Sequence, residues 1–209
     1  VEANGTPSLE WLQWHSKLIW YTGDNPSPLD ETKIARISDY LDGGGKILMS
    51  GQDISTGGLE VEDFLGEYFA VNVASDNVNS TYVFGDTNHE AMNAGDHYSI
   101  SNSTGANNQD SQDSFIALEG GASMFVYPFS DNQTCGVSLK NGTYSSIILG
   151  FGLEALTGFN GDPDTARANL ITRLFDWLDL SYSSLNDRSV NIPREQGIVS
   201  AYPNPFNPE

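Results

Sequence analysis

Three carboxylates follow apolar runs that predict buried strands, and their chemistry suits a ligand. Asp24 and Asp53 come shortly after such runs, and Glu154 follows the last of them. In open α/β sheets, ligands bind at the edge formed by the carboxyl ends of the strands. Carboxylate oxygens at this edge could hold Ca²⁺ or Mg²⁺. Aspartates after strands also cap turns and helices, and we expect that structural role, with no metal and no cofactor.

The candidate ligand edge comprises Asp24, Gly51, Gln52 and Asp53, so it combines two loops of the predicted sheet. A turn that merely ends the strand is the structural alternative for Gly51 and Gln52. A glycan or a calcium ion is the functional alternative, because amide and carboxylate oxygens would face the same edge.

Nucleophilic chemistry has few candidate residues in this chain. The three histidines, His15, His89 and His97, are all distant in sequence from the predicted strand ends. The single cysteine, Cys135, lies beside a predicted hairpin and excludes an internal disulfide. We expect Cys135 to be a small buried apolar side chain.

The charge balance excludes two classes of partner. The 209 residues carry a formal net charge of −19, with 9 lysines and arginines against 28 aspartates and glutamates. Phosphate backbones and anionic membrane surfaces both require positive side chains, so we expect neither nucleic acid nor membrane as a partner. The sequence contains no apolar run long enough to predict a membrane span.

The elements that would position these residues begin with a βαβ unit. An apolar run over 17–22 predicts a strand, and Ser27 with Pro28 predicts the start of a helix that ends at Gly43-Gly44-Gly45. A second buried strand follows over 46–50. A helix between two such strands predicts that the strands are parallel, with a right-handed crossover.

The rest of the chain predicts further elements of an α/β domain over 1–180. A helix is expected over 61–68, a short strand over 71–73, a hairpin around Asp131-Asn132, a strand over 144–151 and a helix capped by Asp162. Residues 74–114 are polar and lack periodicity, so we expect an excursion at the rim of the sheet with at most small strands. The predicted fold is therefore three-layer α/β, with a mainly parallel sheet and an added antiparallel hairpin.

Several segments of the body resemble class I glutamine amidotransferase-like domains. They are Ile19 to Asp24, Ile47 to Ile54, Gly150 to Ala155 and Arg173 to Leu178. The resemblance implies a flavodoxin-like sheet, and it implies a secreted bacterial protein in which such domains accompany peptidase modules.

The same resemblance places catalytic positions. Ser50 falls where the family has its nucleophilic cysteine, Gly152 where it has histidine, and Glu154 where it has glutamate. A serine without a base within hydrogen-bond reach is a poor nucleophile. Because glycine replaces the base, we predict no catalysis, and Ser50 and Glu154 stay candidates only.

A second resemblance concerns the end of the chain. Tyr202 to Pro208 is similar to the opening of the C-terminal sorting domain of the type IX secretion system. We expect residues 181–201 to be a linker and 202–209 to be the start of a truncated sorting domain. Val1 then represents a processed or trimmed start, the chain is a piece of a longer product, and that product is secreted or held at the bacterial cell surface.

Three functions are compatible with these observations. The first is a non-catalytic interaction or support module, with neighbouring domains or other surface proteins as partners. The second is a serine hydrolase, a peptidase or amidase, that uses Ser50 with Glu154 and a histidine from the excursion. The third is a module that binds a glycan or calcium at the sheet edge. An open sheet edge would also permit self-assembly by strand addition.

Overall fold

The computed structural model describes residues 5–23, 25–101, 104–131, 133–158 and 163–180. Its helices are α1 (Leu9–Gln13), α2 (Glu31–Asp42), α3 (Leu59–Phe69), the 3-10 turn η2 (Leu153–Ala155) and α4 (Pro163–Asp179). Its strands are β1 (Leu18–Gly23), β2 (Lys46–Gly51), β3 (Val71–Val78), β4 (Tyr82–Gly85), β5 (His97–Ser99), β6 (Gln112–Ala117), β7 (Gly121–Tyr127), β8 (Gln133–Lys140), β9 (Ser145–Leu149) and β10 (Thr157–Gly158).

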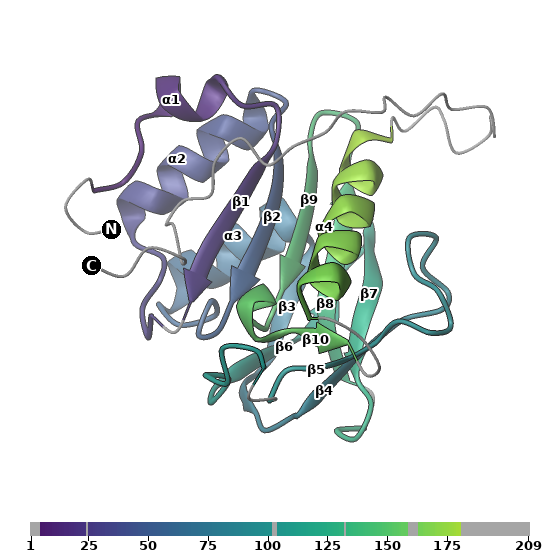
Figure 1. Ribbon diagram of the computed structural model, residues 1–209. Coiled ribbons are helices and arrows are strands. Elements are labelled where there is room, and N and C mark those ends of the chain that lie inside the picture. The colour runs from purple at the N-terminus through teal and green to yellow at the C-terminus, as the bar shows by residue number, and fades with distance from the viewer. Residues whose placement is uncertain (1–4, 24, 102–103, 132, 159–162, 181–209) are drawn as a thin grey trace.

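The strands form one curled, mixed sheet (Figure 1). The order is β1-β2-β9-β8-β7-β4-β5-β10, with β6 paired to β8 and β3 paired to β6. Among the described strands, only the β1–β2 and β2–β9 pairs are parallel, and the other pairs are antiparallel. The expectation of a mainly parallel, flavodoxin-like sheet is therefore wrong. The antiparallel strands outnumber the parallel ones because the chain from β3 to β8 runs back and forth without crossover helices.

The predicted βαβ unit is confirmed. β1 pairs with β2 in parallel, and the register places Ile19 beside Leu48. Helix α2 begins later than expected, because Asp30 rather than Ser27 is its N-cap: the Asp30 carboxylate accepts a hydrogen bond from the backbone N–H of Lys33 at 2.9 Å. A capping carboxylate satisfies one of the unpaired N–H groups of the first turn. The expected cap of the last helix, Asp162, lies outside the described residues.

Residues 74–114 contribute strands to the sheet, and the small strands expected there are present. They contain most of β3, all of β4 and β5, and the first residues of β6. Strands β3 and β4 lack continuous buried runs, because one face of this part of the sheet is partly exposed. The expected hairpin is confirmed, since β7 and β8 pair antiparallel around residues 128–132.

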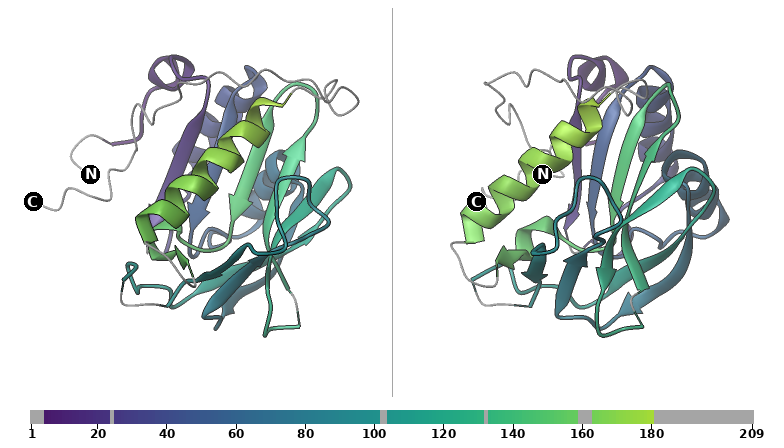
Figure 2. Two further views of the ribbon diagram at one scale, coloured as in Figure 1. Left: turned by 45° about the vertical axis from the view of Figure 1, so that its right-hand side comes forward. Right: turned by 90° about the vertical axis from the view of Figure 1, so that its right-hand side faces the viewer.

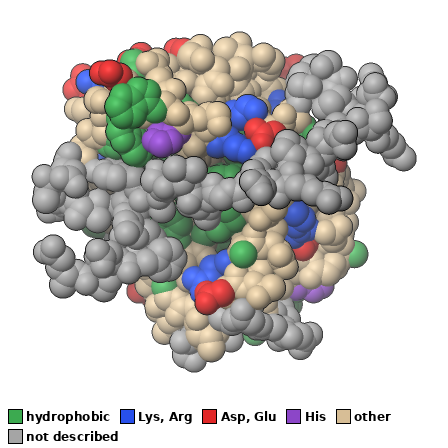
Figure 3. Space-filling model, turned by 45° about the horizontal axis from the view of Figure 1, so that its top comes forward, with side chains coloured by type: hydrophobic (Ala, Val, Ile, Leu, Met, Phe, Trp, Pro, Cys, Tyr) green, Lys and Arg blue, Asp and Glu red, His purple; other side chains and the backbone are tan. Residues whose placement is uncertain are grey.

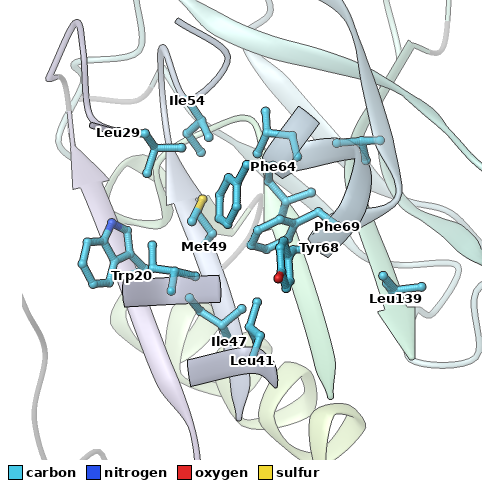
Figure 4. Close-up of a cluster of buried hydrophobic side chains, with 14 of the residues drawn as sticks. Trp20, Leu29, Leu41, Ile47, Met49, Ile54, Phe64, Tyr68, Phe69 and Leu139 are labelled. Carbon is cyan, nitrogen blue, oxygen red and sulfur yellow. The ribbon is translucent and has the colours of Figure 1, made fainter. Parts of the chain in front are cut away.

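Helices cover the two faces of the parallel strands (Figure 2). One hydrophobic cluster lies under α1, α2 and α3 and includes the side chains labelled in Figure 4, among them Trp20, Met49 and Phe69. The second cluster lies under α4 and includes Leu48, Ile147 and Leu174. The two clusters lie on opposite faces of β2 and β9 because neighbouring side chains of a strand point to opposite faces. No helix among the described residues is long and apolar enough to span a membrane.

An ion pair ties α4 to the antiparallel strands. The guanidinium of Arg173 donates to both carboxylate oxygens of Asp96, at 2.7 and 2.6 Å, and to the hydroxyl of Tyr98 at 3.1 Å. Burial alone would raise the pKa of Asp96, but the hydrogen bonds from Arg173 hold that pKa below its usual value. A bidentate pair of this kind fixes both distance and orientation between the elements it joins.

The end of the molecule that carries α1 presents hydrophobic side chains beside a histidine (Figure 3). Trp11 packs against the core cluster, and the centroids of the Trp11 and His15 rings lie 4.6 Å apart. Trp14 is 73% exposed. Trp11 therefore packs against the core, whereas Trp14, which follows α1 directly, is largely exposed.

Candidate functional site

Polar side chains converge where β1, β2 and β9 end, and we call this group the strand-end network. Its members are Tyr21, Ser50, Gln52, Asp53, Asn108, Gln109, Asp113 and Glu154. They come from the ends of β1 and β2, from η2, from the start of β6 and from the loop that precedes it. The carboxyl ends of the parallel strands β1, β2 and β9 meet here.

Ser50 is fully buried, and its hydroxyl has two backbone partners. Its Oγ donates to the carbonyl of Phe151 at 2.9 Å and accepts from the N–H of Leu153 at 3.0 Å. A serine hydroxyl has a single proton, and here that proton points at a carbonyl. The hydroxyl therefore joins the end of β2 to the segment between β9 and η2, and it has no proton left to give to a base.

The space above Gly152 is filled by Glu154. A Cβ added to Gly152 would overlap with both carboxylate oxygens of Glu154. The Tyr21 hydroxyl donates to this carboxylate and accepts the backbone N–H of Glu154. Burial, followed by the negative charge of Glu154, raises the pKa of Tyr21 far above its usual value. The Glu154 carboxylate therefore fills the space that a side chain at position 152 would need.

Two amides complete the shell around the same carboxylate. Asn108 Nδ2 and Gln109 Nε2 lie 3.2 and 3.4 Å from Glu154 Oε1. The other end of the Gln109 amide accepts the backbone N–H of Gly152 at 2.7 Å. The loop before β6 therefore covers the strand ends. It supplies two hydrogen-bond donors to the half-buried carboxylate of Glu154.

Gln52 and Asp53, two members of the predicted ligand edge, bind this same loop. Gln52 is 1% exposed, and its Oε1 accepts the backbone N–H groups of Asp110 and Ser111 at 2.5 and 2.8 Å. Asp53 accepts the hydroxyl of Ser111 at 2.8 Å and has a left-handed backbone, with φ at 53°. Both side chains hold the protein's own loop in place.

Asp113 is the most perturbed carboxylate of the network. Its side chain is fully buried and accepts the Ile54 N–H at 2.8 Å and the Ser55 hydroxyl at 2.5 Å. Burial raises the pKa of Asp113 to about 6, although the hydrogen bonds from Ser55 and Ile54 oppose that shift. The carboxyl therefore titrates within the physiological range while it holds the turn after β2.

The histidines have partners elsewhere. His89 accepts the Ala91 N–H on Nδ1 at 3.1 Å, so its proton lies on Nε2, which donates to Ser138 at 2.8 Å. His15 packs on Trp11, and His97 stacks on Phe84 with ring centroids 3.9 Å apart. In the described part of the chain, Ser50 has no histidine contact.

Of the remaining residues singled out from the sequence, Cys135 is described by the structure and Asp24 is not. Cys135 is fully buried, as expected, and burial raises the pKa of its thiol. Asp24 lies outside the described residues. Over the ranges that the structure describes, no group of three histidine, cysteine, aspartate or glutamate side chains could hold a metal ion.

Sequence reasoning missed Tyr21, Asn108, Gln109 and Asp113. Tyr21 sits in an apolar strand, and the other three belong to a polar stretch without periodicity. One signal existed: the run from Asn107 to Ser114 is entirely polar yet leads directly into a strand. Polar residues that are buried need hydrogen-bond partners, so such a run indicates a network rather than a solvated loop.

Comparison with known proteins shows the fold alone. No protein-family model matches the chain, and no curated protein matches it. The mmIFT52 N-terminal domain is similar in structure, with a TM-score of 0.58 and 16% identity over 84% of this chain and 82% of that one. A ThuA-like protein from Bacteroides uniformis has a TM-score of 0.52 and 13% identity over 84% and 74%. A β-galactosidase from Rahnella has a TM-score of 0.52 and 15% identity over 80% of this chain and 23% of that enzyme.

These neighbours correct both resemblances stated from the sequence. The chain is structurally related to ThuA-like proteins, and its curled mixed sheet differs from the flavodoxin-like sheet that the amidotransferase resemblance implied. The sorting-domain resemblance rests on Tyr202 to Pro208, which lie outside the described residues, as does the predicted linker over 181–201. No family model matches the chain, so the type IX assignment has no support from the comparisons, and the secreted or cell-surface location stays a prediction.

Proposed function

We propose that this chain is a non-catalytic interaction or support module. The observation that carries the proposal is the hydroxyl of Ser50, whose proton is donated to the Phe151 carbonyl and whose lone pair accepts the Leu153 N–H. A nucleophile needs a base within hydrogen-bond reach and a free path to its substrate. Within the described ranges the Ser50 hydroxyl contacts two backbone groups and no histidine, and the residue is 0% exposed, so neither condition is met in this arrangement.

The rest of the strand-end network supports the same role. Glu154 occupies the space over Gly152, and the loop held by Gln52 and Gln109 covers the strand ends. Among the described residues, each side chain of the network is bound to another part of the chain rather than presented to a ligand. The hydrogen bonds of the network therefore hold β2, η2 and the start of β6 together.

The similarity to the Rahnella β-galactosidase also favours a support role. This chain matches 23% of that enzyme's length, so a fold of this type occurs as one part of a larger enzyme. A support module in this sense stabilises or presents a neighbouring domain and requires no reacting residues of its own.

A serine-directed fluorophosphonate probe tests the proposal. The intact protein is incubated with the probe, and its mass is measured before and after. We expect no covalent adduct, because the buried hydroxyl is engaged with two backbone groups. Ser146→Ala is the matched control, since Ser146 is also buried and donates to the Tyr68 carbonyl at 2.6 Å. An adduct that forms on the native protein, persists in Ser146→Ala and disappears in Ser50→Ala would establish the serine hydrolase instead.

A further inference from the structure

The longest stretch of the chain without a positive side chain builds most of the antiparallel sheet. Between Lys46 and Lys140 the sequence contains no lysine or arginine, but it contains thirteen aspartates and glutamates. This stretch supplies α3 and strands β3 to β7. A surface built from it attracts cations and repels anions.

A group of aromatic rings lies within this stretch, and we call it the aromatic cluster: Tyr82, Phe84, His97 and Phe129. His97 and Phe129 are exposed, and Tyr82 and Phe84 are half-buried. Tyr82 and Phe84 share one face of β4, whereas Val83 between them is buried in the core. His97 lies opposite Phe84 on β5. Phe129 comes from the turn between β7 and β8, and its ring centroid lies 5.8 Å from that of Tyr82 and 6.2 Å from that of Phe84.

Core packing does not account for the position of Phe129. Its side chain is 75% exposed, so it gains little from burial, and its edge-on contacts with two other rings hold it on the outside of the sheet. Strands β4 and β5 lie at the end of the molecule farthest from α1 in Figure 1. Exposed aromatic side chains of this kind are enriched at protein interfaces.

We propose that the aromatic cluster is the docking surface for a positively charged segment of a partner protein. The inference rests on the proposed interaction role and names the chemistry of the partner. Aromatic faces attract ammonium and guanidinium groups, and a guanidinium also stacks flat on a ring. Asp131 lies two residues after Phe129 and is exposed, so a carboxylate accompanies the rings.

Charge complementarity favours this partner over the alternatives. A neutral glycan would use the rings but would gain nothing from Asp131 or from the negative charge of the stretch between Lys46 and Lys140. An anionic partner would be repelled by that charge. A cationic segment uses both features, because the rings contact its side chains and the negative charge raises its local concentration.

The test uses a short fluorescein-labelled peptide of alternating arginine and glycine, with the matched citrulline–glycine peptide as a neutral probe of the same shape. Binding to the full chain is followed by fluorescence anisotropy. We expect the arginine peptide to bind and the citrulline peptide to bind at least about tenfold more weakly. We expect Phe129→Ala to weaken binding of the arginine peptide by about tenfold. Leu59→Ala, which removes a side chain 77% exposed on α3, is the control and should change nothing.

A second variant separates the contribution of charge from that of the rings. Asp131 has a left-handed backbone, with φ at 52°, and asparagine tolerates that conformation well, so Asp131→Asn should fold normally. It should weaken binding severalfold at low salt and less at about 150 mM salt, because screening reduces the attraction.

Two outcomes would overturn the inference. Equal binding by the native protein and Phe129→Ala would mean that net charge alone attracts the peptide. Binding of a neutral oligosaccharide that Phe129→Ala abolishes, without any effect on the arginine peptide, would assign the rings to a glycan. Neither outcome depends on the state of Ser50, so failure here is distinct from an adduct formed by the fluorophosphonate probe.

Discussion

Replacing Asp113 by asparagine should stabilise this protein at neutral pH and leave it unchanged in acid. Burial raises the pKa of Asp113 from 3.8 to about 6, so the folded state binds its proton more tightly than the unfolded state. Protonation of Asp113 adds to the free energy of unfolding. This contribution is fully present below pH 3.8 and is lost as the pH rises to about 6. A shift of this size corresponds to a ceiling of about 3 kcal/mol in the free energy of unfolding.

Asparagine reproduces the neutral form of the side chain. Its carbonyl can still accept the Ile54 N–H, and the Ser55 hydroxyl can turn to accept from its amide. Urea unfolding of both proteins, followed by circular dichroism from pH 4 to pH 8, measures the difference. We expect Asp113→Asn to be more stable than the native protein at pH 7, by up to about 3 kcal/mol, and to lie within about 0.5 kcal/mol of it near pH 4.

The exposed Asp110 provides the control for this experiment. Asp110→Asn removes one nearby surface charge, and it should change the free energy of unfolding by less than about 0.5 kcal/mol at every pH. A difference between Asp113→Asn and the native protein that stays constant from pH 4 to pH 8 would refute the reasoning. A loss of stability in Asp113→Asn at pH 7 would refute it as well.

Two further substitutions test other parts of the structure. Arg173→Met should lower the free energy of unfolding by about 1.5–3 kcal/mol in urea melts, because it removes the counter-charge of Asp96 and leaves that carboxylate with only the Asn93 N–H and the Tyr98 hydroxyl as donors; an unchanged midpoint would mean that the ion pair contributes nothing. Gly152→His should cost about 1–3 kcal/mol and create no esterase activity, since its side chain must displace Glu154; turnover of a chromogenic ester that requires both the introduced imidazole and Ser50 would contradict this account.

The parallel part of the fold was predictable because its signals are local. The strand–helix–strand pattern from Leu18 to Gly51 places helical periodicity between two apolar runs, and this pattern specifies parallel pairing. The antiparallel part was not predictable in the same way. Its strands are short and polar on one face, and their pairing depends on partners distant in sequence, such as β3 with β6.

The common edge at which the parallel strands end was predictable, but the contacts between side chains at that edge were not. Residues after β2 and β9 do meet, because parallel strands end at a common edge. The pairing of Glu154 with Tyr21, however, joins residues 133 positions apart, and a polar loop before β6 supplies the other donors. Sequence spacing contains no information on such contacts, since they form only when distant elements pack.

The unfolding free energy of Ser50→Ala tests most directly whether the hydroxyl at the end of β2 is structural. The native protein, Ser50→Ala and the reference variant Ser146→Ala are unfolded in urea at pH 7. Loss of the Ser50 hydroxyl leaves the Phe151 carbonyl and the Leu153 N–H without their partner, so we predict a loss of about 1–3 kcal/mol, similar to that of Ser146→Ala. A Ser50→Ala protein as stable as the native one would contradict the account.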